Sequence, residues 1–278
     1  MKIDILLSTY NGAPFLEELL QSLYAQTFTD WHLLIRDDGS EDNTPQLLEN
    51  YREKDRNRIT FITDGDKQLG PKRSFEKLLQ KSEADYILFC DQDDVWLPNK
   101  IEHTLKKMQE LESKNPHTPA LVFSDLTVTD NNLQIVHPSL WKFTKVNPEN
   151  INNIYKLIIN NPVVGCTVMI NKKLKEQALP FPAGAIMHDL WLAITAAANG
   201  EIVYLNEPAV LYRIHSNNTI GASRTDKKYY LKRLKNLHLT MLQNRNAIKM
   251  LRFQDKNFNI GKFMYYKILV TFNKLFRI

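Results

Sequence analysis

Apolar residues in the first half of the chain alternate between two spacings. Short apolar runs of strand length occur at residues 3–7, 31–35, 59–62, 86–90 and 120–123. Between these runs, apolar residues recur at helical spacing, within residues 15–23, 44–51, 74–79 and 101–111. Strands that alternate with helices of this length are typical of a mostly parallel sheet with helices on both faces. The pattern therefore predicts an α/β fold.

The second half, from about residue 140, is less regular. Residues 163–170 and 202–205 have the composition of strands, and residues 189–198 carry apolar side chains on one helix face. Beyond Arg224 the pattern predicts helix, with one break near residues 259–261. We therefore expect one domain over residues 1–224, in two halves that meet near residue 125, and a helical extension over residues 225–278.

Composition places the chain among globular proteins, since 43% of its 278 residues are hydrophobic and 24% are charged. Two cysteines, Cys90 and Cys166, cannot build a disulfide scaffold. Asp4 interrupts the first apolar run, so the start is not that of a signal peptide. Apolar runs stay shorter than the ~18 to 20 residues that a membrane span needs. We therefore expect a cytoplasmic protein.

The net charge of +5 is unevenly distributed. Residues 225–278 hold 13 Lys or Arg and two acids, a net charge of +11, which leaves −6 for the preceding 224 residues. A basic, aromatic, helical segment of this kind suits an anionic membrane surface, where the protein would be peripheral. The alternative is that these helices pack on the body of the protein or on another subunit.

Polar residues follow four of the predicted strands, at residues 8–12, 36–40, 91–94 and 124–125, and six of them are carboxylates. In a parallel sheet the ligand lies beyond the carboxyl ends of the strands. We therefore expect these residues to gather at one edge. The alternative, a set of ordinary solvated loops, does not call for so many acids together.

Asp91-Gln92-Asp93 is the most informative of these segments. Two carboxylates at this spacing, after a buried strand, can bind one hard divalent cation such as Mg²⁺ or Mn²⁺, which bridges to phosphates. An acidic body would otherwise repel a nucleotide diphosphate. Alone, Asp-x-Asp is common in solvated turns, but here Asp94-Val95-Trp96-Leu97-Pro98 follows it, and we include Trp96 among the substrate-binding residues.

The first two strand ends predict a site for a nucleoside. Asp38, in Asp37-Asp38-Gly39-Ser40, can accept a hydrogen bond from the N3–H of uracil or thymine, although an Asp-Gly turn is the alternative. Ser8, Thr9 and Tyr10 offer hydroxyl groups and a ring against which a base and ribose could pack.

Two later segments supply further candidates. Asp189, which follows His188, can act as a general base for an incoming hydroxyl, or can simply cap the helix that begins there. In the segment 212–218, Arg213 suits a diphosphate and His215 can ligate a metal, and Ser216 adds a hydroxyl to the substrate site. A lone histidine is more often structural, but this one is flanked by polar residues.

Together these motifs resemble the family 2 glycosyltransferases with the GT-A fold, over about residues 1–224. The resemblance rests on STYNG, RDDGSEDNT, FCDQDDVWLPNKI, MHDLWLA and YRIHSNNTIGA. The last three look most like bacterial rhamnosyltransferases and related enzymes of cell-surface polysaccharide assembly. The family resemblance implies a nucleotide-sugar half at about residues 1–125 and an acceptor half at about residues 126–224. The basic segment 225–278 has no counterpart in the resemblance.

The resemblance also implies roles for individual residues. Ser8, Tyr10 and Asp38 fall where the family binds the nucleoside, and Asp189 falls on the family's catalytic Asp. Asp91 and Asp93 form the family's Asp-x-Asp element, with Asp93 favoured as the direct ligand of Mn²⁺ or Mg²⁺, and Arg213 and His215 are similar to the family's basic element. Because histidine can ligate a metal, His215 is also a candidate metal ligand. Many members have Glu-Asp where this chain has His188-Asp189, so contacts of His188 with the acceptor are expected to differ.

The implied reaction is an inverting displacement, in which Asp189 deprotonates a hydroxyl of a glycan or lipid-linked acceptor. The favoured donor is dTDP-L-rhamnose, and UDP-hexoses are the alternative. A nucleic-acid-binding protein that uses the basic tail is disfavoured by the acidic body. Dehydrogenase, P-loop and nucleotidyltransferase functions lack their glycine-rich motifs in this sequence.

Overall fold

The computed structural model describes residues 1–215 and 237–276. Its strands are β1 (Ile3–Thr9), β2 (His32–Asp37), β3 (Ile59–Phe61), β4 (Tyr86–Asp91), β5 (Val95–Trp96), β6 (Ala120–Thr129), β7 (Ile135–His137), β8 (Met169–Asn171) and β9 (Glu201–Arg213). Its α-helices are α1 (Ala13–Tyr24), α2 (Thr44–Lys54), α3 (Gly70–Lys81), α4 (Lys100–Lys114), α5 (Leu140–Thr144), α6 (Ile154–Ile159), α7 (Lys172–Ala178), α8 (His188–Asn199), α10 (Leu237–Gln254) and α11 (Ile260–Phe276). Two short 3₁₀ helices are η1 (Pro148–Asn152) and η2 (Gly165–Thr167).

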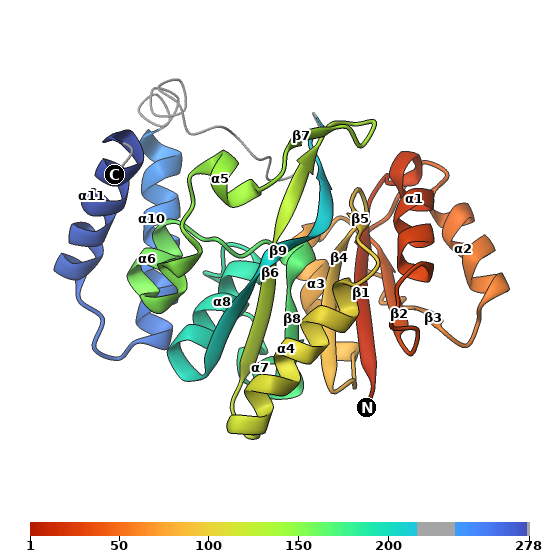
Figure 1. Cartoon of the computed structure of the whole chain (residues 1–278), viewed down its shortest axis with the longest axis horizontal. Helices are drawn as coiled ribbons and strands as arrows, with labels where there is room; N and C mark the ends of the chain where they lie inside the picture. Colours follow the sequence, from red (N-terminus) through yellow and green to blue (C-terminus); the bar gives the residue numbers. More distant parts are fainter. Residues whose placement is uncertain (216–236, 277–278) are drawn as a thin grey trace.

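The strands form one mixed sheet in the order β3-β2-β1-β4-β8-β6-β9-β5, and β7 pairs with the outer part of β6 (Figure 1). The pairs β1–β2, β1–β4, β2–β3 and β6–β9 are parallel. β8 runs antiparallel to both of its neighbours, β4 and β6. The predicted α/β architecture, a mostly parallel central sheet flanked by helices, is therefore confirmed.

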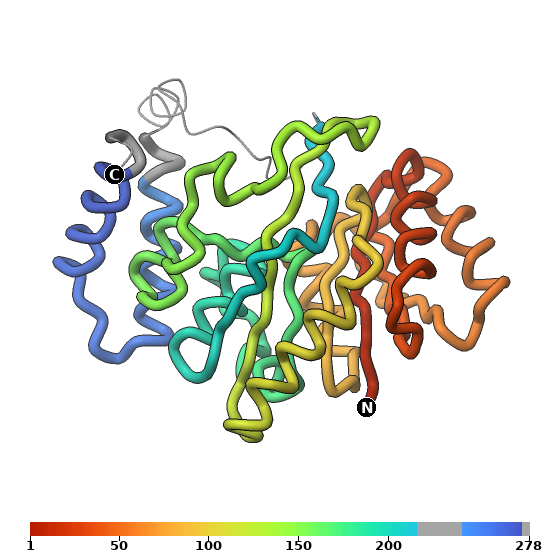
Figure 2. The backbone as a smooth tube through the Cα atoms, viewed as in Figure 1, coloured from red at the N-terminus to blue at the C-terminus, as the bar shows by residue number. Residues whose placement is uncertain are grey.

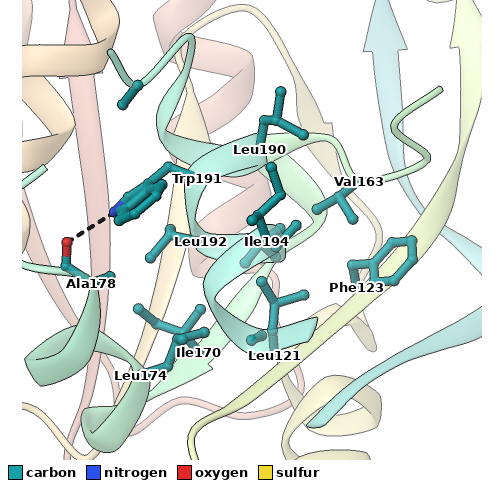
Figure 3. Close-up of a cluster of buried hydrophobic side chains, with 14 of the residues drawn as sticks. Leu121, Phe123, Val163, Ile170, Leu174, Ala178, Leu190, Trp191, Leu192 and Ile194 are labelled. Carbon is teal, nitrogen blue, oxygen red and sulfur yellow. Dashed lines mark hydrogen bonds between the residues drawn. The ribbon is translucent and has the colours of Figure 1, made fainter. Parts of the chain in front are cut away.

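Successive side chains of the central strands point into two different cores, as the two-residue period of a strand requires. On β1, Leu6 joins the core under α3 and α8, while Ile5 and Leu7 join the core under α1 and α4. Figure 3 shows part of the first core, where Trp191 of α8 donates a hydrogen bond from Nε1 to the carbonyl of Ala178 at 2.9 Å. Helices on both faces explain why β1, β2 and β4 are almost wholly buried.

The predicted break in the C-terminal helical segment is present between α10 and α11. These two helices lie at the opposite end of the molecule from α1 and α2 (Figure 2). Ala247, Met250 and Leu251 of α10 and Phe263 of α11 are buried in the same core as α8. One face of the segment therefore packs on the body of the protein. Among the helices that the structure describes, none is both long and apolar enough to cross a membrane.

The two strands predicted in the second half of the chain differ from the observed ones. Residues 163–170 form η2 followed by the start of the short strand β8, because an apolar run of this length has no period that separates strand from other buried backbone. β9 continues to Arg213, well past the predicted end at residue 205. Its pairing with β6 shifts register between Ser124 and Asp125, opposite Pro208, so the polar interruption in the pattern corresponds to a β-bulge.

Candidate functional site

The register of the parallel strands aligns the expected polar residues. Ser8 of β1 lies opposite Arg36 of β2 on one side and opposite Asp91 of β4 on the other. One residue further, Thr9 lies opposite Asp37. The carboxyl ends of β1, β2 and β4 therefore meet at one edge of the sheet, as the sequence predicted for these three strands. The expectation for residues 124–125 was wrong, because they lie within β6, where the buried carboxylate of Asp125 accepts hydrogen bonds from Ser139 and from the N–H of Leu140.

Thr9 and Asp37 organise the loops at this edge. Thr9 is buried and donates a hydrogen bond from its hydroxyl group to Oδ1 of Asp37 at 2.9 Å. The Asp37 carboxylate also accepts hydrogen bonds from the backbone N–H of Ser40 at 2.8 Å and from the Ser40 hydroxyl at 2.5 Å. The half-buried Ser8 and the exposed ring of Tyr10 remain beside these loops as groups that a nucleoside could contact.

Gln92, the middle residue of Asp-x-Asp, joins the first loop to the fourth. Its Oε1 accepts a hydrogen bond from the Tyr10 N–H at 2.8 Å, and its Nε2 donates one to the Tyr10 carbonyl at 3.0 Å. A Cβ atom at Gly12 would lie 2.3 Å from Gln92 Oε1, so only glycine allows this approach. Sequence reasoning missed Gln92, because its role depends on a contact across 82 residues.

Asp38 lies deeper than the sequence suggested. It is buried, and its carboxylate accepts hydrogen bonds from Arg36 at 2.6 Å and from the N–H groups of Leu69 and Gly70 at 2.9 and 2.8 Å. Arg36, also buried, bonds Asp64 as well. A carboxylate has about four acceptor positions, so these donors occupy most of them. Contact of Asp38 with a base stays a prediction.

Asp93 and His215 are brought together from opposite halves of the sequence. Nε2 of His215 lies 2.8 Å from Oδ2 of Asp93, and the imidazole stacks on Phe15 of α1 with 4.8 Å between ring centroids. Both side chains are mostly buried. A carboxylate oxygen and an imidazole nitrogen at this separation are two groups that one divalent cation can bind.

A second group of ligand atoms lies beside this pair. Carboxylate oxygens of Asp91 and Asp94 and the sulfur of Cys166 lie within 4.8 Å of one another, in the part of the chain that the structure describes. Burial and the charges of Asp93 and Asp189 raise the pKa of Asp91 to about 7. Burial contributes most to this shift, and the smaller contributions of Asp93 and Asp189 indicate that both carboxylates lie near Asp91. Neither Asp94 nor Cys166 was predicted as a metal ligand, because neither forms a known metal-binding spacing with other candidate ligands in the sequence.

Asp189 is in the first turn of α8 and faces the same region. Burial raises the pKa of its carboxyl group to about 6, and its Oδ1 accepts a hydrogen bond from the N–H of Leu190 at 2.6 Å. The alternative helix-cap role was wrong, because the cap is Met187 and Asp189 lies inside the helix. A carboxylate with this pKa is ionised at neutral pH but still basic enough to accept a proton.

His188 is enclosed in the core next to Asp189. Its ring lies 4.2 Å from the ring of Phe75 and 5.3 Å from that of Phe89, between centroids. Burial lowers the pKa of the imidazole to about 3, and neither ring nitrogen has a hydrogen-bond partner among residues 1–215 and 237–276. A Cβ atom at Gly165 would lie 2.6 Å from its Nε2. The expected contact of His188 with substrate is therefore not present in this arrangement.

Arg213 is buried and bonded to protein groups, so it is not exposed to a phosphate. Its Nε donates to the carbonyl of Asp93 at 3.0 Å, and its two terminal nitrogens donate to Glu18 of α1 and to the carbonyl of Asn131. It is 2% exposed. The guanidinium therefore fixes the loop that carries Asp93 against α1, and the predicted diphosphate contact would need these bonds to rearrange.

Trp96 is a core residue, which corrects its assignment to the substrate site. β5 pairs with β9 and directs the indole inward, where it is 2% exposed. The ammonium of Lys100 lies 3.3 Å from the ring centroid, and burial lowers the pKa of Lys100 to about 7. Ser216, the last candidate, lies outside the described residues.

A family model settles what kind of protein this is. The model described as Glycosyl transferase family 2 matches residues 4–177, which hold β1 to β8 and the whole Asp-x-Asp segment. The chain is a member of glycosyl transferase family 2. The predicted resemblance is therefore confirmed.

Two curated relatives match most of this glycosyltransferase in sequence, and one solved structure matches its fold. It is 28% identical over 235 residues to the dTDP-rhamnosyl transferase RfbG of Shigella flexneri, covering 81% of this chain and 76% of the relative. It is 26% identical over 226 residues to the putative teichuronic acid biosynthesis glycosyltransferase TuaG of Bacillus subtilis, covering 80% and 82%. The crystal structure of S. aureus TarS 1–349 with UDP-GlcNAc covers 92% of this chain and 74% of its own, with a TM-score of 0.57 and 21% identity.

Proposed function

We propose that this glycosyltransferase transfers a sugar from a nucleotide-diphosphate donor to a hydroxyl group of a glycan or lipid-linked glycan, with inversion, in cell-surface polysaccharide synthesis. The best candidate for the sugar is L-rhamnose, from dTDP-L-rhamnose. One observation carries the proposal: the Asp93–His215 pair, Asp91 and Asp189 converge at the carboxyl edge of the sheet. A cation-binding pair beside a separate basic carboxylate is what transfer from a diphosphate requires.

The residues present fit a divalent metal ion, Mn²⁺ or Mg²⁺. Asp93 and His215 would hold it, and Asp91 lies close enough for its pKa to respond to Asp93. A bound cation would neutralise charge on the diphosphate as the sugar leaves. The protein's own contribution is to hold Asp93 in place. Arg213 donates a hydrogen bond to its backbone carbonyl, and His215, which contacts its carboxylate, is held by stacking on Phe15.

Asp189 is proposed as the general base. Its ionised carboxylate would accept the proton of the acceptor hydroxyl as that oxygen attacks the anomeric carbon. Ser8 and Tyr10, at the end of β1, are proposed to contact the nucleoside, and the Gln92 bonds to Tyr10 hold that loop beside Asp91 and Asp93. Nucleoside and diphosphate would then lie along one edge of the sheet.

The donor assignment is supported by the relative RfbG, a dTDP-rhamnosyl transferase. The alternative is a UDP-hexose donor, which the UDP-GlcNAc complex of TarS supports. Uracil and thymine both carry the N3–H that Asp38 was expected to bind. The residues near the nucleoside therefore do not distinguish a UDP-sugar from a dTDP-sugar.

A donor screen tests the proposal. The protein would be incubated with dTDP-L-rhamnose, dTDP-glucose, UDP-glucose and UDP-GlcNAc, each with Mn²⁺, with Mg²⁺ and with EDTA, and both thermal shift and release of the nucleotide would be measured. We expect stabilisation and hydrolysis with dTDP-L-rhamnose only when a metal is present. Preference for a UDP-sugar would support the alternative donor, and no response to any of them would contradict the proposed function.

A further inference from the structure

The outward face of α11 is apolar, which reverses the usual arrangement of a surface helix. Ile260, Met264, Ile268 and Phe272 follow one another every four residues, and their exposed fractions are 49%, 49%, 67% and 48%. Residues four apart lie on the same side of a helix, so these four side chains form one stripe. We call them the α11 stripe.

The opposite side of α11 accounts for its packing on the protein. Phe263 is buried in the core, and the ring of Tyr266 stacks on Tyr155 of α6 with centroids 5.9 Å apart. Lys267 reaches Asn244 of α10, which places the two C-terminal helices side by side (Figure 1). The helix is therefore anchored to the protein through its other face, while the side chains of the α11 stripe are about half exposed or more.

The two C-terminal helices carry bases and no acid within their bounds. Residues 260–276 contain three lysines and no acid, and residues 237–254 contain Arg245, Lys249 and Arg252 and again no acid. Those three α10 side chains are spaced so that they share a helix side, and all three are exposed. Tyr265, also exposed, is an amphipathic side chain of the kind that gathers at membrane interfaces.

We infer that the α11 stripe is a docking surface for an anionic phospholipid membrane, on which α11 lies parallel to the surface. An apolar stripe on a helix that carries lysines and no acid matches an interface of acyl chains and anionic headgroups. A second copy of the chain fits less well, since a symmetric contact of this face with itself would bring lysines of both copies together with no acid from either helix to neutralise them. The inference adds a partner to the proposed function, namely the surface at which a lipid-linked acceptor would be met.

Vesicle binding of the full chain tests this inference without any sugar nucleotide. Co-sedimentation would be measured with phosphatidylcholine vesicles, alone or with about one third phosphatidylglycerol. We expect binding to the anionic vesicles that falls as salt is raised. The double variant Met264→Ser/Ile268→Ser should bind them at least about tenfold more weakly, because it removes two inserted side chains. The matched control is Ile135→Ser/Val136→Ser, which removes two equally exposed apolar side chains from β7 and should bind normally.

A second measurement reports insertion directly. The tryptophans at positions 31, 96, 141 and 191 are all buried, so Ile268→Trp adds one exposed indole. We expect its emission to shift to shorter wavelength and to be quenched by brominated lipids when anionic vesicles are added. Unaltered emission, or equal binding by the stripe variant, would overturn the inference.

Two further results would overturn the inference or part of it. Concentration-dependent dimers that disappear in Met264→Ser/Ile268→Ser would assign the stripe to a second copy and overturn membrane docking. Equal binding to neutral and anionic vesicles would overturn the requirement for anionic lipid. Failure of the proposed function is distinguishable, because donor hydrolysis is measured without vesicles and should be the same in the stripe variant as in the unaltered protein.

Discussion

The imidazole Nε2 of His215 lies 2.8 Å from the carboxylate Oδ2 of Asp93, although 122 residues separate them in the sequence. The pairing depends on β9, which runs along β6 and delivers its last residues to the edge where β4 ends. Phe15 supports the imidazole from α1. Three separate parts of the chain therefore have to fold correctly before these two ligand atoms face each other.

Removal of the imidazole should weaken metal binding. In His215→Ala the carboxylate of Asp93 remains, so we expect the Mn²⁺ concentration for half-maximal donor hydrolysis to rise by at least about 10- to 100-fold, because even loss of a residue that only supports a metal ligand lowers metal affinity by about that much. A Mn²⁺ titration of hydrolysis measures it. His103→Ala, at an exposed position on α4, is the control. If His215→Ala needs no more Mn²⁺ than the unaltered protein, His215 is not a ligand.

Neutralising the proposed base should remove transfer but not donor binding. Asp189→Asn keeps the shape of the side chain, and loss of a general base lowers turnover by on the order of 10²- to 10⁴-fold. The thermal shift given by the donor with Mn²⁺ should persist, because Asp189 is not among the proposed nucleotide contacts. Near-normal transfer by this variant would show that another group accepts the proton.

The rate of transfer should depend on pH through Asp189. Burial raises the pKa of this carboxyl group to about 6, and only the ionised form can accept a proton. At saturating metal, kcat/KM should therefore fall about tenfold per pH unit well below pH 6 and level off above pH 7. A profile from pH 4.5 to 8.5, with the folded state checked by fluorescence at each pH, measures this. A rate that stays constant down to pH 5 would contradict the assignment.

How far the sequence alone reaches can be judged from particular residues. The positions of Asp37 and Asp91 at strand ends were predictable, because an apolar run followed by acids locates the carboxyl end of a buried strand. His215 was a candidate metal ligand only because histidine can bind a metal, and its contact with Asp93 was not predicted. No local pattern reports which distant segments become neighbours.

The parts that could not be predicted depend on tertiary contacts. Trp96 and Arg213 belong to segments near the site, but β5 turns the indole into the core and the guanidinium is taken up by Glu18 and two carbonyl groups. Gln92 matched no chemical motif, yet it joins two loops by two hydrogen bonds. Polar residues at a site can thus bind protein rather than substrate, and composition does not distinguish the two.

Arg213 should contribute to stability more than a surface ion pair does. Arg213→Lys keeps the positive charge but cannot reach Glu18, Asn131 and Asp93 together, so it loses hydrogen bonds that the buried guanidinium makes to the carbonyl groups of Asp93 and Asn131. We expect a loss of about 2 to 4 kcal/mol in the free energy of unfolding, measured in urea. Glu18→Gln, at a half-exposed position, should cost less than about 1 kcal/mol. Equal effects of both variants would mean that the carbonyl contacts of Arg213 contribute little.

Gly165 and His188 should be energetically coupled. A Cβ atom at Gly165 would lie 2.6 Å from Nε2 of His188, and the imidazole cannot move aside because Phe75 and Phe89 pack against it. Gly165→Ala should therefore destabilise the protein by about 1 to 3 kcal/mol through overpacking.

In the background of His188→Ala the obstructing ring is gone, so adding Gly165→Ala should cost less than about 0.5 kcal/mol. A double-mutant cycle by urea unfolding gives the coupling directly. Because Asp189 adjoins both residues, Gly165→Ala should also reduce transfer while leaving the half-maximal Mn²⁺ concentration unchanged. Additive effects in the cycle would contradict this coupling. They would mean that the backbone of η2 shifts to accept the methyl group, so that the His188 ring does not obstruct it.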